Sequence, residues 1–278
     1  MKARDWALPV IIIVVALAAA AWYFYGSRGG GPATAPAATT SPAPAPEAGT
    51  PAEDNTPQNP VPVVPPPSET VPPSPPLPLL GSSDAEMRQS LLGLFDTAPV
   101  EAFLVPQDII RRFVAMIDNL PEPALPMRVR PIRKIDRGFV VQQQDGSLAL
   151  SPSNAARYAG FVEAVQLADA KRVSEVYFRY YPLFQSAYEE LGHPGRYFND
   201  RLVQVIDHLL ATPEVAGPIP LARPKVFYQF ADPTLESLSA GQKAMIRIGP
   251  ENAEVVKAKL RELRARIATR HAGGEPAH

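Results

Sequence analysis

Apolar residues recur every three or four positions through much of the second half of this chain, which is the pattern of helices that bury one face. The longest such stretch covers 170–191, with Asp169 placed to cap its start and Gly192 to end it. A second stretch at 198–211 follows after only about six residues, which predicts an antiparallel helix pair. Further helices are predicted over 83–95, 106–117, 152–165, 239–248 and 251–270, the last with so narrow an apolar stripe that we expect it to pack at the periphery.

A second pattern, alternation of apolar and polar residues, covers 139–150. The pair Asp145-Gly146 interrupts it at a point where a tight turn would join two strands, so a β-hairpin is predicted. Aromatic and β-branched residues at 226–230 predict a third short strand. The expected fold class is therefore α+β and mostly helical, with one globular domain at 82–271 that contains a small β-hairpin or sheet.

The N-terminal region has a different character. Residues 7–25 form an uncharged run of 19 residues, long enough as a helix to cross a bilayer. A cleavable signal peptide is the alternative, but four successive aromatic residues at 22–25 favour a retained anchor at the membrane surface. Because Lys2 and Arg4 precede the run, we expect residues 1–6 in the cytoplasm and the C-terminal domain in the periplasm, as in a single-pass protein of the bacterial inner membrane.

Between this predicted transmembrane helix and the domain lies a segment that we call the linker, residues 26–81. It holds half of the chain's 34 prolines and no aromatic residue. Such a composition buries too little apolar surface to offset the entropy of ordering, so the linker is predicted to be disordered with polyproline II character. Fully extended at ~3.1 Å per residue it would span on the order of 170 Å. Residues 272–278 are predicted to be a disordered tail.

The composition of the chain and the motifs that it lacks exclude several classes of site and argue against others. The chain has no cysteine, which excludes disulfides, thiolate zinc sites and iron–sulfur clusters. A net charge of -1 argues against a nucleic-acid-binding protein. No phosphate-binding glycine loop and no nucleophile motif of the common hydrolases is present, so no cofactor is predicted.

Several short motifs resemble, in order and spacing, the bacterial membrane-anchored family known as domain of unknown function 3014. The similarity spans most of 82–263. The overall layout also resembles that of the family, with one N-terminal membrane span and a proline-rich linker. The resemblance implies this architecture but no activity, ligand or catalytic residue. The motifs include Asp118-Asn119-Leu120-Pro121, Tyr180-Tyr181-Pro182-Leu183-Phe184-Gln185, Leu191-Gly192, Phe198-Asn199-Asp200, Ile206-Asp207-His208, Asp232-Pro233, Leu235-Glu236, Gln242-Lys243 and Gly249-Pro250.

One group of residues could carry chemistry. Asp200, Asp207 and His208 lie along one polar flank of the helix at 198–211, with His193 in the preceding loop. Together they could form a metal site or an acid/base site. The alternative is that Asp200 helps to cap the helix and His208 is a hydrogen-bonded boundary residue, which the absence of a recognised metal-ligand spacing favours.

Two basic clusters and a tyrosine-rich helix suggest a binding surface instead. Its predicted residues are Arg128, Arg130, Arg133, Tyr180, Tyr181, Arg261 and Arg264. Outside the cytoplasm, such a surface would meet anionic lipid, acidic polymers or acidic proteins. We therefore expect a binding or scaffolding domain for a cell-envelope protein or polymer. An envelope hydrolase or metal-dependent enzyme centred on Asp200, Asp207 and His208 is the alternative.

Overall fold

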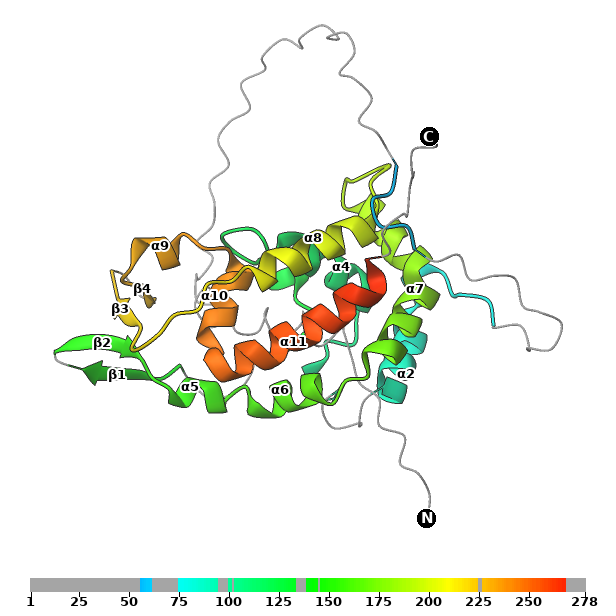
Figure 1. The fold of residues 1–278 in the computed structure, drawn as a ribbon. Helices are drawn as coiled ribbons and strands as arrows, with labels where there is room; N and C mark the ends of the chain where they lie inside the picture. The colour runs from blue at the N-terminus through cyan, green and yellow to red at the C-terminus, as the bar shows by residue number, and fades with distance from the viewer. Residues whose placement is uncertain are drawn as a thin grey trace, which may run out of the picture.

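The computed structural model describes residues 56–61, 75–94, 100–101, 103–133, 139–144, 146–224 and 227–268. They form a mostly helical domain with a small four-stranded antiparallel sheet at one end (Figure 1). The helices are α2 (Asp84–Leu94), α4 (Ile109–Asn119), α5 (Ser153–Ala156), α6 (Ala159–Gln166), α7 (Ala170–Glu190), α8 (Phe198–Leu210), α9 (Pro233–Glu236), α10 (Ala240–Arg247) and α11 (Pro250–Ile267), with the 3-10 turns η1 (Leu80–Ser82) and η2 (Met127–Val129).

Helices α7 and α8 match the predicted stretches closely. The Asp169 carboxylate accepts the backbone N–H groups of Lys171 and Arg172, which confirms the predicted cap of α7. Helix α8 is capped from α7, because Gln185 Oε1 accepts the backbone N–H of Phe198 at 2.9 Å. The expectation of an antiparallel pair is wrong, since Figure 1 shows α8 leading away from the end of α7 rather than back along its length. Helix α8 contacts α7 and also packs against α4 and α11.

Helix α11 packs one face against α6, α7, α8 and α10 and leaves the opposite face exposed (Figure 1). The prediction that it packs at the periphery is wrong. Its apolar stripe is at most 1% exposed and consists of Val256, Leu260, Leu263 and Ile267. Two lysines beside the stripe are buried too, because Lys257 and Lys259 donate to the backbone carbonyls of Thr212 and Ala168. Their aliphatic stems extend the buried face beyond the apolar residues.

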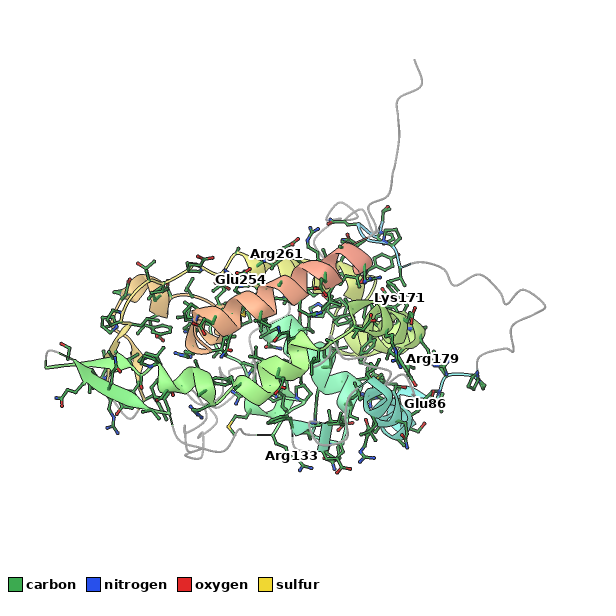
Figure 2. The ribbon with its side chains drawn as sticks, turned by 60° about the horizontal axis from the view of Figure 1, so that its bottom comes forward. Glu86, Arg133, Lys171, Arg179, Glu254 and Arg261 are labelled. Atoms are coloured by element: carbon green, nitrogen blue, oxygen red, sulfur yellow. The ribbon has the colours of Figure 1, made fainter. Side chains whose placement is uncertain are left out.

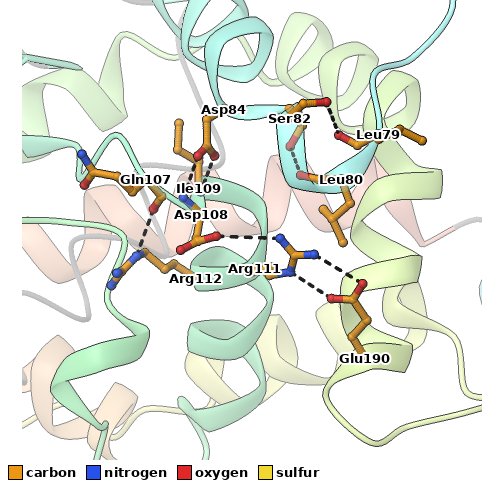
Figure 3. A network of polar contacts seen from close by, with 11 residues as sticks. Leu79, Leu80, Ser82, Asp84, Gln107, Asp108, Ile109, Arg111, Arg112 and Glu190 are labelled. Carbon is orange, nitrogen blue, oxygen red and sulfur yellow. Dashed lines mark hydrogen bonds and ion pairs between the residues drawn. The ribbon is translucent and has the colours of Figure 1, made fainter.

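The start of α4 is stabilised from α2. Helix α4 begins at Ile109, and the residue before it, Asp108, has a left-handed backbone conformation (φ 51°). The Asp84 carboxylate accepts the backbone N–H groups of both residues at 2.8 Å, as Figure 3 shows. At the start of α2, the Ser83 hydroxyl donates to the Leu80 carbonyl, and the Glu86 carboxylate accepts from Arg179 and Tyr180 of α7.

The sheet has the order β1-β2-β3-β4, with every neighbouring pair antiparallel. Strands β1 (Val141–Gln144) and β2 (Ser147–Leu150) form the predicted hairpin, with Gly146 at φ 77° in the turn. Strand β4 (Gln229–Phe230) lies within the predicted third strand, whereas β3 (Pro220–Ala222) was not predicted. The sheet covers a second, smaller apolar core formed by Ile219, Leu221, Phe230 and Ile246.

Two parts of the linker lie against the domain. Residues 56–61 contact the start of α8, and at 75–80 Leu77 and Leu80 pack against the main core. The expectation of disorder along the whole linker is therefore wrong at these residues, where specific contacts offset the ordering entropy. Among the residues that the structure describes, no helix has the length and apolar character to span a bilayer. The predicted span at 7–25 and the predicted tail at 272–278 lie outside those residues.

Candidate functional site

The predicted site residue His193 forms a polar cluster with Asp118 and Arg201. Its Nε2 lies 3.0 Å from Asp118 Oδ2, and Arg201 Nε donates to the other carboxylate oxygen at 2.8 Å. Arg201 also donates to the Asp118 backbone carbonyl, and the ring of Tyr188 stacks on His193 with centroids 4.4 Å apart. Because both oxygens of Asp118 are engaged, the cluster ties the end of α4 to the α7–α8 loop and to α8.

Asp200 lies next to Arg201 in sequence but binds the linker. Its carboxylate accepts the backbone N–H groups of Gln58 at 3.0 Å and Asn59 at 2.6 Å. The Asn59 side-chain amide donates to it as well, at 3.1 Å. Asp200 is therefore an acceptor for a docked peptide segment, a role that neither sequence-based alternative included.

Asp207 and His208 also have separate partners. Arg264 of α11 forms a two-pronged ion pair with the Asp207 carboxylate, with its Nη2 2.8 Å from Oδ2. His208 Nε2 lies 2.8 Å from the hydroxyl oxygen of Ser239. A serine hydrogen-bonded to a histidine can act as a nucleophile with its base. Ser239, however, is buried, and its hydroxyl accepts the backbone N–H of Gln242 as the cap of α10. This contact supports a structural role for the pair.

The burial of His208 predicts how the stability of the domain depends on pH. Burial lowers the pKa of His208 below its usual value, and the charge of Arg201 acts in the same direction. As pH falls, His208 of the unfolded chain therefore takes up a proton before His208 of the folded protein does. The free energy of unfolding starts to decrease near the unfolded pKa of ~6.5 and continues to decrease until the pH reaches the lower folded pKa. We expect His208→Gln, which can still bond Ser239, to lose less free energy of unfolding between about pH 7 and about pH 5 than the wild type. Urea unfolding followed by circular dichroism measures this, and an equal loss in both proteins would contradict it.

The four predicted residues thus do not converge on one site. Asp200 binds the linker, Asp207 binds α11, and His208 and His193 bind Ser239 and Asp118. Within the described part of the chain, no three histidine or acidic side chains come together where they could hold a metal ion. The geometry gives no support to a site centred on Asp200, Asp207 and His208.

Much of the predicted binding surface is internal. Tyr180 is 1% exposed, and its hydroxyl binds Glu86 and Ser90, whereas half-buried Tyr181 binds Gln185. Arg130 is 4% exposed, donates to the Leu125 carbonyl at 2.8 Å, and has its pKa lowered to about 9 by burial. These contacts contradict a surface role for Tyr180 and Arg130, because neither side chain reaches solvent.

The C-terminal basic cluster is largely neutralised within the protein. Arg261 pairs with Glu254 at 2.8 Å, both in view in Figure 2, and Arg264 pairs with Asp207. The predicted surface is therefore reduced to the residues around η2.

That remaining surface, which we call the η2 edge, consists of Arg112, Met127, Arg128 and Arg133. Arg128 and Arg133 are exposed, and the Met127 side chain is 52% exposed. The Arg112 guanidinium donates to the carbonyls of Gln107 at 3.0 Å and Arg128 at 2.6 Å, so it holds η2 against α4. Among the described residues, none of these three arginines forms an ion pair with a carboxylate. Figure 2 shows Arg133 far from Glu254 and Arg261.

Residues of the family-like motifs near α9 and α10 connect the sheet to the helices through hydrogen bonds. Lys243, 1% exposed, donates to the Glu236 carbonyl at 2.9 Å and approaches its carboxylate at 3.4 Å. The same carboxylate accepts the backbone N–H of Phe230 in β4, and Asp232 caps α9. These residues have clear structural roles.

Comparison with known proteins agrees with the resemblance stated from the motifs. The family model described as "Protein of unknown function (DUF3014)" matches residues 109–264, more than half of the chain. Searches of curated proteins and of solved structures found no significant match. The chain therefore belongs to the family of proteins of unknown function designated DUF3014.

Proposed function

We propose that this chain is a single-pass protein of the bacterial inner membrane whose domain stands in the periplasm and binds an anionic component of the cell envelope. The uncharged run at 7–25 and the positive charges before it support the anchor and its orientation. The η2 edge supports the binding role, because it presents exposed arginines that have no acidic partner in the described part of the domain.

Several other arginines of the domain differ from those of the η2 edge in this respect. Arg111, Arg179 and Arg201 all pair with carboxylates of the domain itself. An exposed guanidinium without such a partner keeps its donors available for a carboxylate or phosphate group, which it can bind with two parallel hydrogen bonds. Met127 supplies an adaptable apolar contact beside them. The edge thus combines charge for attraction with a nonpolar surface for packing.

Charge reversal at the η2 edge tests the proposal. A photo-crosslinking amino acid at position 127 of the full-length chain should yield a discrete adduct in cells. The double variant Arg128→Glu/Arg133→Glu should reduce the adduct at least about tenfold, because opposed like charges slow association and weaken the complex. The fold should persist, since exposed substitutions usually change stability by no more than about 0.5 kcal/mol.

The matched control is Lys171→Glu/Arg261→Glu, which changes net charge equally at exposed residues elsewhere on the domain (Figure 2). This variant should keep the adduct. Absence of an adduct from position 127, or equal loss in both double variants, would contradict the proposal.

A further inference from the structure

The linker segment that contacts α8 is held by a specific set of polar contacts. It reads Pro57, Gln58, Asn59, Pro60. Proline has no backbone N–H, so Gln58 and Asn59 carry the only two backbone N–H donors of the segment. Both donate to the single carboxylate of Asp200, at 3.0 and 2.6 Å. Every backbone donor of this four-residue segment is therefore used by one side chain.

The prolines also reduce the cost of binding. Pro60 disfavours helical backbone at Asn59, and both prolines fix their own φ angles. The prolines thus restrict the backbone before the segment docks with bends at Gln58 and Asn59, so less conformational entropy is lost. This explains how a stretch within a proline-rich linker acquires a defined position.

The receiving surface contains a buried polar side chain aimed at the segment. Asn199 is 0% exposed, and its amide donates to the Asn59 carbonyl at 2.7 Å and to the Ile267 carbonyl at 3.0 Å. Its Oδ1 accepts the Tyr177 hydroxyl at 3.0 Å, which fixes the orientation of the amide. The site is therefore built from α7, α8 and the end of α11 and is held in place by the core.

The docked segment itself is weakly buried. None of residues 56–61 is fully buried, and Thr56 and Gln58 are exposed. Its attachment consists of hydrogen bonds rather than apolar packing, and contacts of this kind open at low free-energy cost. An attachment that is specific yet shallow is suited to exchange.

We propose that Asn199 and Asp200 form a binding site for peptide segments that bend at two adjacent backbone amides between prolines, and that residues 57–60 are its resident, exchangeable occupant. Asp200 binds the two backbone N–H groups and the side-chain amide of Asn59. A partner segment that offers the same groups would therefore compete with residues 57–60 for the site. For the proposed membrane-anchored form, release also lengthens the free linker: its greatest span rises from roughly 95 Å to roughly 150 Å at ~3.1 Å per residue, because Leu77 and Leu80 still pack against the domain. This last consequence rests on the proposed function, whereas the peptide site does not.

The test uses the full-length chain and a fluorescent peptide with the sequence of residues 55–62. Gln58→Pro/Asn59→Pro removes both backbone donors from the linker and should vacate the site. This variant should bind the peptide at least tenfold more tightly than the wild type, in which the tethered segment competes at an effective concentration in the millimolar range. Adding Asp200→Ala should abolish binding, and a peptide carrying the two prolines should not bind.

Two controls separate loss of the backbone donors from loss of the side chains and from unfolding. Gln58→Ala/Asn59→Ala retains both backbone donors and should resemble the wild type more closely than the proline variant does. Far-UV circular dichroism should show that every variant is folded. Failure of the peptide to bind the vacated site up to about millimolar concentration, or equal binding with and without Asp200, would overturn the proposal. Neither outcome depends on the membrane anchor or on the η2 edge.

Discussion

Replacement of Leu260 by Ala should lower the free energy of unfolding by about 2–5 kcal/mol, because the truncated side chain leaves a cavity in the middle of the domain. Leu260 is 0% exposed, and its helix α11 packs against four other helices. If α11 packed at the periphery, the surrounding side chains could collapse and the loss would be small. Urea unfolding of the full-length protein in neutral detergent, followed by far-UV circular dichroism, measures the change. Tryptophan fluorescence is unsuitable because Trp6 and Trp22 lie outside the domain.

The control for this prediction lies one residue further along α11. Arg261 is exposed and its ion pair with Glu254 is exposed too. Such a pair contributes about 0–1 kcal/mol, so Arg261→Ala should change stability little. Similar losses in both variants would contradict the burial of this face of α11 against four helices.

Replacement of Phe198 by Ala should cost about 3–5 kcal/mol, a loss typical of deleting a buried aromatic ring. Phe198 is 0% exposed and its ring lies 5.9 Å from Phe184, 6.2 Å from Phe113 and 5.6 Å from Tyr188, centroid to centroid. The ring thus joins α4, α7 and α8. The same unfolding measurement applies, and Phe198→Leu should recover part of the loss because it refills most of the volume. A cost below about 1 kcal/mol for the alanine variant would contradict this packing.

The helices were largely predictable because their buried faces are apolar at helical spacing. Residues such as Val173, Tyr177 and Phe184 mark the buried face of α7, and Asp169 marks its start. The position of α11 was not predictable by the same rule. Lys257 and Lys259 counted as polar in the pattern, yet both are buried through bonds to backbone carbonyls. Those carbonyls belong to residues 45 and 91 positions away, which no local pattern reveals.

The sheet shows a second limit. The hairpin of β1 and β2 carries a turn pair and clear alternation, and both were recognised. Strand β3 has only three residues and begins with Pro220, which lacks a donor for the ladder. A segment this short holds too few positions to display alternation.

The polar clusters illustrate why site prediction failed. The sequence places Asp200, Asp207 and His208 on one flank of a helix, but each finds a partner on a different element. His193 pairs with Asp118, 75 residues earlier in the chain. The Asp118-Asn119-Leu120-Pro121 motif marks a helix end in the sequence, but it does not reveal His193 and Arg201 as the partners of Asp118.

The average composition of the linker did not indicate that one short segment docks on the domain. Over 26–81 the composition indicates disorder, but a four-residue binding motif contributes little to that average. The spacing of Pro57 and Pro60 around two free amides was visible in the sequence. Its importance depends on Asp200, 141 residues after Asn59.

The proposal of an envelope-binding domain depends most on the side of the membrane on which the domain stands. Because the chain has no cysteine, single introduced cysteines report this directly. A membrane-impermeant maleimide applied to cells with a permeable outer membrane should label Glu163→Cys, an exposed position on α6, and should label Lys2→Cys only after the inner membrane is broken. Labelling of Lys2→Cys in intact cells with protection of Glu163→Cys, or recovery of the protein free of the membrane and cleaved near Trp22, would contradict the account.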